Sequence, residues 1–144
     1  MARSRIVAIA TLLGTLLATL LILLGPTPSA QANQAVHPEW GHLKGHSGVL
    51  RTGCHTYHYR YWITPPHGLW AIETFITGPG LKHLAAGAFL DGYDPERGRG
   101  KFILCSPTTH PGRFTIRAKL SVQDGQDYVE GWLPPAHFRL RAPR

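Results

Sequence analysis

The sequence predicts an all-β protein, an antiparallel β-sandwich of about seven strands that follows an N-terminal signal helix. Turn-forming Gly, Pro and Asp recur every 8–12 residues from Ser47 onward. The runs between them have the length of strands and are rich in aromatic and β-branched residues. With 4 Trp, 5 Tyr and 5 Phe among 144 residues, the chain has too many apolar rings to remain disordered.

The N-terminus has the pattern of an export signal. Arg3 and Arg5 precede an uncharged apolar run over residues 6–24, and Ala30-Gln31-Ala32 fits the small-residue pattern of a cleavage site. We therefore assign residues 1–32 to a signal peptide and expect a secreted, extracellular protein. The alternative is an uncleaved membrane anchor, because 19 apolar residues are just enough to span a bilayer.

The remaining chain divides into an irregular arm over residues 33–46 and the β-sandwich domain over residues 47–144. Without Arg3 and Arg5 it carries 13 basic and 8 acidic residues, a net charge of +5. A basic exported protein favours acidic partners such as an anionic polymer, a glycan or another component of the cell envelope. A solvated basic surface with no dedicated partner is equally compatible with this charge, and no specific nucleic-acid recognition is predicted.

Three segments alternate strictly between apolar and polar residues, as half-buried strands do. The first covers residues 57–63, with the tyrosines on one face and His58, Arg60 and Trp62 on the other. The second covers residues 113–122 and the third residues 137–142. Weaker strands are predicted at 69–77, 86–91 and 100–106, while residues 81–87 allow one helical turn at most.

The two cysteines, Cys54 and Cys105, lie 51 positions apart and are expected to form a disulfide in an oxidising compartment. Cys105 alternates with Ile103 and Lys101, opposite the apolar Phe102 and Leu104. Both cysteines therefore fall on the outward side of their strands. An immunoglobulin-like or similar sandwich is expected, but with a bridge at the sheet edge or on its outer surface and not the cross-core bridge of antibody domains.

The outward cations of the second and third segments are the predicted ligand-binding residues. If these two strands pair, five cations share one face, and like charges opposite each other destabilise a sheet. Acidic neighbours (Asp124, Asp127 and Glu130 are candidates) or an anionic ligand would offset that cost. Trp62 adds a flat ring that suits a sugar or a protein partner. The predicted set is Arg113, Arg117, Lys119, Arg139, Arg141 and Trp62.

No cofactor and no metal is predicted, but one segment favours a second hypothesis. Cys105-Ser-Pro-Thr-Thr-His110 resembles the ligand loop of the cupredoxins, which are exported β-sandwiches that bind copper. The resemblance implies Cys105 and His110 as ligands, with His58 or His67 as the upstream imidazole. Residues 33–144 contain no Met for the axial position, although a weak axial ligand can be replaced. Cys54 competes for Cys105 as a disulfide partner.

No catalytic residues are predicted, and an unassigned secreted hydrolase is a third hypothesis. Ser47 lies in Gly-His-Ser-Gly-Val, which lacks the second glycine of the G-x-S-x-G turn. Asp91, Asp94 and Glu96 have the composition of a calcium-binding turn without the EF-hand spacing. An acidic β-turn, in which Asp and Gly have their usual structural roles, is the simpler interpretation.

Two segments carry a broader resemblance. Residues 54–61 (Cys-His-Thr-Tyr-His-Tyr-Arg-Tyr) and residues 111–117 (Pro-Gly-Arg-Phe-Thr-Ile-Arg) resemble small exported β-sandwich proteins of actinobacterial type without an assigned function. This resemblance implies export and a sandwich fold, and it identifies no catalytic residue.

Overall fold

A computed structural model describes residues 35–144, except for the side chains of residues 82–86. The chain is almost entirely β-structure, with one short 3-10 helix, η1 (Pro38–Trp40). The strands, in chain order, are β1 (Gly41–Gly45), β2 (Gly48–Val49), β3 (Cys54–Ile63), β4 (Leu69–Gly78), β5 (Leu81–Leu90), β6 (Arg97–Cys105), β7 (Gly112–Asp124), β8 (Asp127–Trp132) and β9 (Ala136–Arg141).

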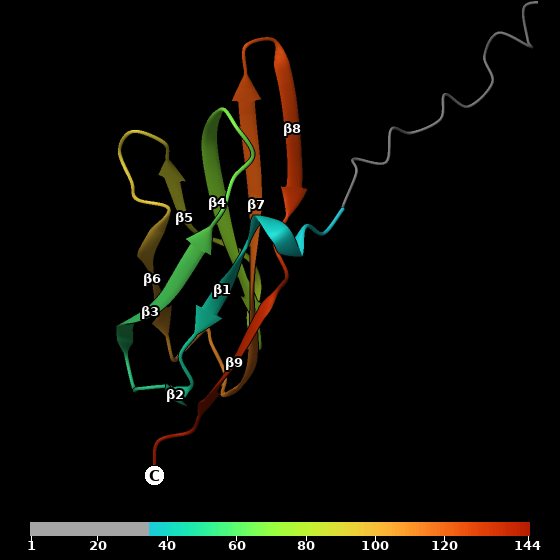
Figure 1. The fold of residues 1–144 in the computed structure, drawn as a ribbon. Helices are drawn as coiled ribbons and strands as arrows, with labels where there is room; N and C mark the ends of the chain where they lie inside the picture. Colours follow the sequence, from blue (N-terminus) through green and yellow to red (C-terminus); the bar gives the residue numbers. More distant parts are fainter. Residues whose placement is uncertain (1–34) are drawn as a thin grey trace, which may run out of the picture. The chain divides into compact units, whose positions relative to one another are not determined.

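The strands form two sheets that pack against each other (Figure 1). The small sheet has the order β1-β3-β6, and both pairings are antiparallel. The large sheet has the order β2-β9-β7-β4-β5, and β8 also pairs with β7. One side of the long strand β7 pairs with β9 over its first residues and with β8 over its last, so the β7–β8 hairpin extends beyond the small sheet.

The core lies between the two sheets and follows the alternation of the sequence. On β3, Tyr59, Tyr61 and Ile63 are buried, as predicted. On β7, every second residue from Phe114 to Val122 is buried, also as predicted. Aromatic rings meet across the layers, as where Phe102 of β6 lies 5.7 Å from Phe138 of β9 between ring centroids. These contacts fix which face of each strand remains in solvent.

Tyr59 connects the two sheets by a hydrogen bond as well as by packing. Its hydroxyl donates to Thr74 Oγ1 on β4 at 2.5 Å, and Thr74 in turn donates to the Gly87 carbonyl at 3.0 Å. The Tyr59 ring lies over Gly100 of β6, where a Cβ would collide with it. Glycines on the inner face of β6 therefore accommodate the large rings of β3. The outward residues of β6 alternate with these glycines along the strand.

The all-β prediction is confirmed, with several differences in detail. The described residues contain nine strands instead of about seven, and β2 and β9 run parallel while the other pairs are antiparallel. Residues 41–45, expected to lie in an irregular arm, form β1 because they pair with residues 59–63 of β3. Residues 81–87, where one helical turn was allowed, are part of β5. The predicted signal helix falls outside the described residues.

Candidate functional site

The outer surface of the small sheet carries a dense group of cations. The sequences of β1, β3 and β6 contain five Lys and Arg residues and no Asp or Glu. All five cationic side chains are exposed, because their inward neighbours fill the core. We call this surface the basic face and define it by its outward residues: His42, Lys44, His58, Arg60, Trp62, Arg97, Arg99 and Lys101.

The strand register arranges these residues in rows across the sheet. Lys44, Arg60 and Arg99 are direct neighbours on three successive strands. Since neighbouring strands are about 4.8 Å apart, the backbone positions of these three cations lie within about 10 Å of one another. The next row toward the N-terminus of β6 contains His42, Trp62 and Arg97. The next row toward the C-terminus of β6 contains His58 and Lys101. Successive rows are about 7 Å apart along the strands.

These charges have no acidic partners among residues 35–144. Within residues 35–144, no carboxylate forms an ion pair with a cation of the basic face. The five cations also account for the whole net charge of residues 33–144, because the other eight Lys and Arg residues equal the eight acids in number. The basic face therefore carries a number of cations equal to the net charge of residues 33–144.

Trp62 is held in a defined position on this surface. Its ring stacks on His42 of β1, with 4.7 Å between centroids and 16° between planes. On the β6 side, a hollow of about 210 Å³ is lined by Arg60, Trp62, Arg97, Gly98 and Arg99. A larger hollow of about 530 Å³ adjoins it and shares His58, Arg60 and Arg99 with the basic face. Both hollows are open to solvent, so the whole surface is accessible to a large ligand.

The predicted binding residues on the large sheet have different surroundings. Strands β7 and β9 pair as expected, and Arg113 lies directly opposite Arg139. Arg117 and Lys119 lie beyond the end of β9, so the five cations do not form one continuous group. Arg113, Arg139 and Arg141 are exposed, while Arg117 and Lys119 are half-buried.

Arg117 and Lys119 are each occupied by neighbouring side chains. The Lys119 ammonium lies 3.2 Å from a Glu73 carboxylate oxygen and 3.6 Å from one of Glu130. The hydrogen bond to Glu73 is the main reason that the pKa of Lys119 is raised. The Arg117 guanidinium lies 4.0 Å from the centroid of the Trp132 ring, in a cation–π contact. These partners neutralise or cover Arg117 and Lys119, while Arg113 and Arg139 remain opposite each other with no ion pair among residues 35–144.

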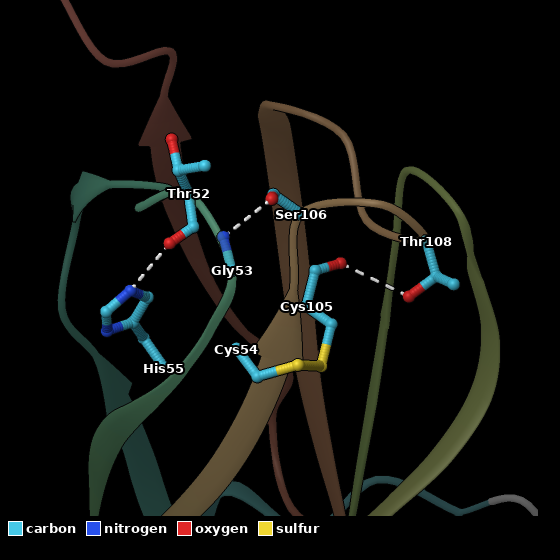
Figure 2. Close-up of a disulfide and its surroundings, with 7 residues drawn as sticks. All are labelled: Thr52, Gly53, Cys54, His55, Cys105, Ser106 and Thr108. Carbon is cyan, nitrogen blue, oxygen red and sulfur yellow. Dashed lines mark hydrogen bonds between the residues drawn. A yellow bond between two sulfur atoms is a disulfide. The ribbon is translucent and has the colours of Figure 1, made fainter.

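The predicted disulfide between Cys54 and Cys105 is present (Figure 2). It lies on the outer side of the small sheet, in register with the outward residues of β3 and β6. The two cysteines are direct partners across β3 and β6. Gly53 donates its backbone N–H to Ser106 Oγ at 2.9 Å beside the bridge. Because the sulfur of Cys105 is bonded to Cys54, it is not a free thiolate, and this argues against the copper site at Cys105 and His110.

The other candidate residues have structural contacts. Asp94 accepts a hydrogen bond from the Leu90 N–H at 2.9 Å, which is the turn role expected for an acidic β-turn. Ser47 Oγ accepts from the Arg139 N–H at 2.9 Å, so it helps to hold β2 beside β9. In the part of the chain that the structure describes, no three His, Cys, Asp or Glu side chains are grouped closely enough to hold a metal ion.

Of the eight residues of the basic face, only Trp62 belongs to the predicted ligand-binding set, although the sequence pattern also places His58 and Arg60 on the outward face of their strand. Residues 98–100 (Gly-Arg-Gly) have the composition of a turn, and the strand predicted over residues 100–106 does not include Arg97 and Arg99. The available signal was Arg-Gly-Arg-Gly-Lys over residues 97–101, where cations recur with a period of two. The glycines between them match the tyrosines on β3, since Gly98 and Gly100 lie under Tyr61 and Tyr59.

Comparisons with known proteins identify no family for this chain. No protein-family model matches it, and no curated protein sequence matches it either. Among residues 35–144, no helix is long and apolar enough to cross a membrane.

Proposed function

We propose that this chain is an exported, non-catalytic module that binds an anionic polymer through the basic face. The observation that carries the proposal is the row of Lys44, Arg60 and Arg99, three adjacent cations with no acidic partner among the described residues. Like charges on neighbouring strands cost free energy when the sheet forms. A polyanion that lies across the row would neutralise these charges. The relief of their mutual repulsion would then contribute to the free energy of binding.

The large sheet supplies an internal comparison. There, Lys119 is neutralised by Glu73 and Glu130, and Arg117 is covered by Trp132. The half-buried cations of the large sheet thus have partners, while the exposed cations of the basic face, like the exposed Arg113 and Arg139 of the large sheet, form no ion pair among residues 35–144. A solvated surface without a ligand would need no such concentration of one charge sign, because interspersed charges give the same solubility without mutual repulsion.

The shape of the surface favours a polymer over a small molecule. The cations are spread over three strands and several rows, and the adjoining hollows are open. Small-molecule sites are usually concave and bury most of the ligand. An extended chain with repeating negative charges would contact several rows at once and gain affinity from each.

The proposal includes export and a sandwich arrangement of the two sheets. The signal pattern over residues 1–32 supports secretion into the extracellular space. The disulfide is compatible with an oxidising compartment. The resemblance of residues 54–61 and 111–117 to small exported β-sandwich proteins of actinobacterial type points the same way. A cell-envelope or extracellular polyanion is the class of ligand that such a protein would meet.

The test compares two triple variants that remove the same charge from different sheets. Arg60→Gln/Arg99→Gln/Lys101→Gln changes the basic face, and Arg113→Gln/Arg139→Gln/Arg141→Gln changes exposed cations of the large sheet. Binding of the exported protein to dextran sulfate and to sodium polyphosphate is measured by titration at several salt concentrations. With five cations engaged, the logarithm of the affinity should fall with the logarithm of salt concentration with a slope of about −3.5.

We expect the basic-face variant to lose at least about 50-fold in affinity at low salt, and the large-sheet variant to lose about 3-fold or less. Equal losses in the two variants would mean that the basic face is not the specific binding site, and that the large sheet or the net charge alone accounts for binding. If the unaltered protein binds neither polymer at low salt, the proposed function is wrong.

A further inference from the structure

The hollow beside Trp62 combines an aromatic ring with three arginines. Arg60, Arg97 and Arg99 line it together with Trp62, and its volume is about 210 Å³. This is below the range of about 300–1,000 Å³ that is typical of pockets for whole small ligands. The hollow is therefore the right size for one unit of a longer chain and not for a complete ligand of its own.

The position of Trp62 is set before any ligand arrives. His42 stacks on the ring from the β1 side, and no residue of β1 lines the hollow. The portion of Trp62 that borders the hollow thus lies on the side away from His42, toward β6. A ring fixed by such a contact loses little conformational freedom on binding, which favours its use as a stacking surface.

The two kinds of side chain recognise different parts of one ligand unit. A Trp ring buries apolar area against a flat partner, and the apolar face of a sugar ring is such a partner. Guanidinium groups form paired hydrogen bonds with sulfate, phosphate or carboxylate. A polyanion without rings, such as polyphosphate, would use the arginines and leave Trp62 without a role.

We infer that the polymer bound by the basic face is an acidic polysaccharide, with one sugar ring against Trp62 and its anionic substituent among Arg60, Arg97 and Arg99. This inference rests on the proposed function and names the class of its ligand. The row of Lys44, Arg60 and Arg99 then supplies contacts to neighbouring units.

The experiment distinguishes the contribution of the Trp62 ring to binding from the contribution of the cations. Binding of the exported protein, Trp62→Leu and Trp62→Phe is measured with dextran sulfate, sodium polyphosphate and single-stranded DNA, matched in charge concentration and salt. Tyr93→Leu is the control, because Tyr93 is an 89% exposed aromatic residue of the β5–β6 turn. Thermal unfolding of each variant verifies that it is folded at the temperature of the titration.

The unaltered protein should bind dextran sulfate about tenfold more tightly than polyphosphate, the order of magnitude expected of one aromatic contact. Trp62→Leu should lose about tenfold with dextran sulfate and less than twofold with polyphosphate, while Trp62→Phe recovers part of the loss. Tyr93→Leu should bind like the unaltered protein.

Three results would overturn the inference. If both polymers bind equally and Trp62→Leu weakens neither, the proposed function survives and the sugar contact does not. If single-stranded DNA binds more tightly than dextran sulfate and depends on Trp62, the ring receives a base instead of a sugar. If no polyanion binds at low salt, the proposed function fails and the inference fails with it.

Discussion

Arg60 and Arg99 lie directly opposite each other on β3 and β6, and neither forms an ion pair with a carboxylate of residues 35–144. Opposed like charges on neighbouring strands each cost a few tenths of a kcal/mol or more. The small sheet thus contains a local source of instability at its most charged point. In a protein of marginal stability, such a feature is expected where function requires it.

Relief of this repulsion should stabilise the protein. Arg60→Thr replaces the central cation of the row by a residue that favours strands, and we expect the free energy of unfolding to rise by about 0.5 kcal/mol at low salt. The gain should shrink at high salt because ions screen exposed charges. Thermal unfolding at two ionic strengths measures both effects.

Arg141→Thr is the matched control, because Arg141 is an exposed cation that lies opposite Val49 and not opposite another charge. It should give no comparable gain. A lower melting temperature for Arg60→Thr at low salt would show that this arginine stabilises the sheet and that the row carries no cost.

Tyr59 should make the protein sensitive to alkali. Burial is the main cause that raises the pKa of Tyr59 from 10.0 to about 12. Between these values the unfolded chain loses the phenolic proton while the folded chain keeps it, so stability falls as pH rises through this window. The loss from this one group is about 2 kcal/mol by pH 12.

Tyr59→Phe removes the titrating group and should flatten the decline between pH 10 and 12. At neutral pH it should cost about 1 kcal/mol, since the hydrogen bond to Thr74 is lost. Thr74 still donates to the Gly87 carbonyl, so no buried donor is left unpaired. Urea unfolding at several pH values measures the slope, with the exposed Tyr93→Phe as control. Parallel pH profiles for Tyr59→Phe and the unaltered protein would contradict the assignment.

The disulfide should contribute a large share of the stability. It closes a loop between residues 51 positions apart, which corresponds to about 4 kcal/mol in the chain-entropy model. Cys54→Ala/Cys105→Ala should lose about that amount in urea unfolding. Reductant should destabilise the unaltered protein to a similar degree and leave the double variant unchanged. A loss below about 1 kcal/mol would mean that the reduced chain already restrains this loop when unfolded.

Export should remove the first 32 residues. The small-residue pattern at residues 30–32 predicts that the secreted protein begins at Asn33. Intact mass and N-terminal sequencing of protein from the medium of an exporting host measure this directly. Recovery of the full chain in the membrane fraction would support an uncleaved anchor instead.

The parts of the fold that sequence predicted are those in which one strand face is apolar. The alternation over residues 57–63 and 113–122 identified the buried residues of β3 and β7 because a half-exposed strand has a period of two. The same reasoning placed Cys54 and Cys105 on the outer face. These results depend on local pattern alone, which a single sequence contains.

The candidate site was harder to predict because it depends on which strands become neighbours. Arg117 and Lys119 had the clearest cationic pattern, yet β8 brings Glu130 and Trp132 beside them. The cations of β6 alternate with glycines that have no apolar side chain to mark an inner face. Their role emerges only when Tyr59 and Tyr61 of β3 are seen to fill the space above Gly100 and Gly98.

The disulfide also determines how the protein would respond to mechanical force. If the two ends of residues 35–144 are pulled in opposite directions, tension passes through the bridge and does not extend the segment between Cys54 and Cys105 while the bridge is intact. Four of the five cations of the basic face, Arg60, Arg97, Arg99 and Lys101, lie within this closed loop. Only the flanking segments can lengthen under such a load, so β3 and β6 with these four cations are protected while β1 with Lys44 is not.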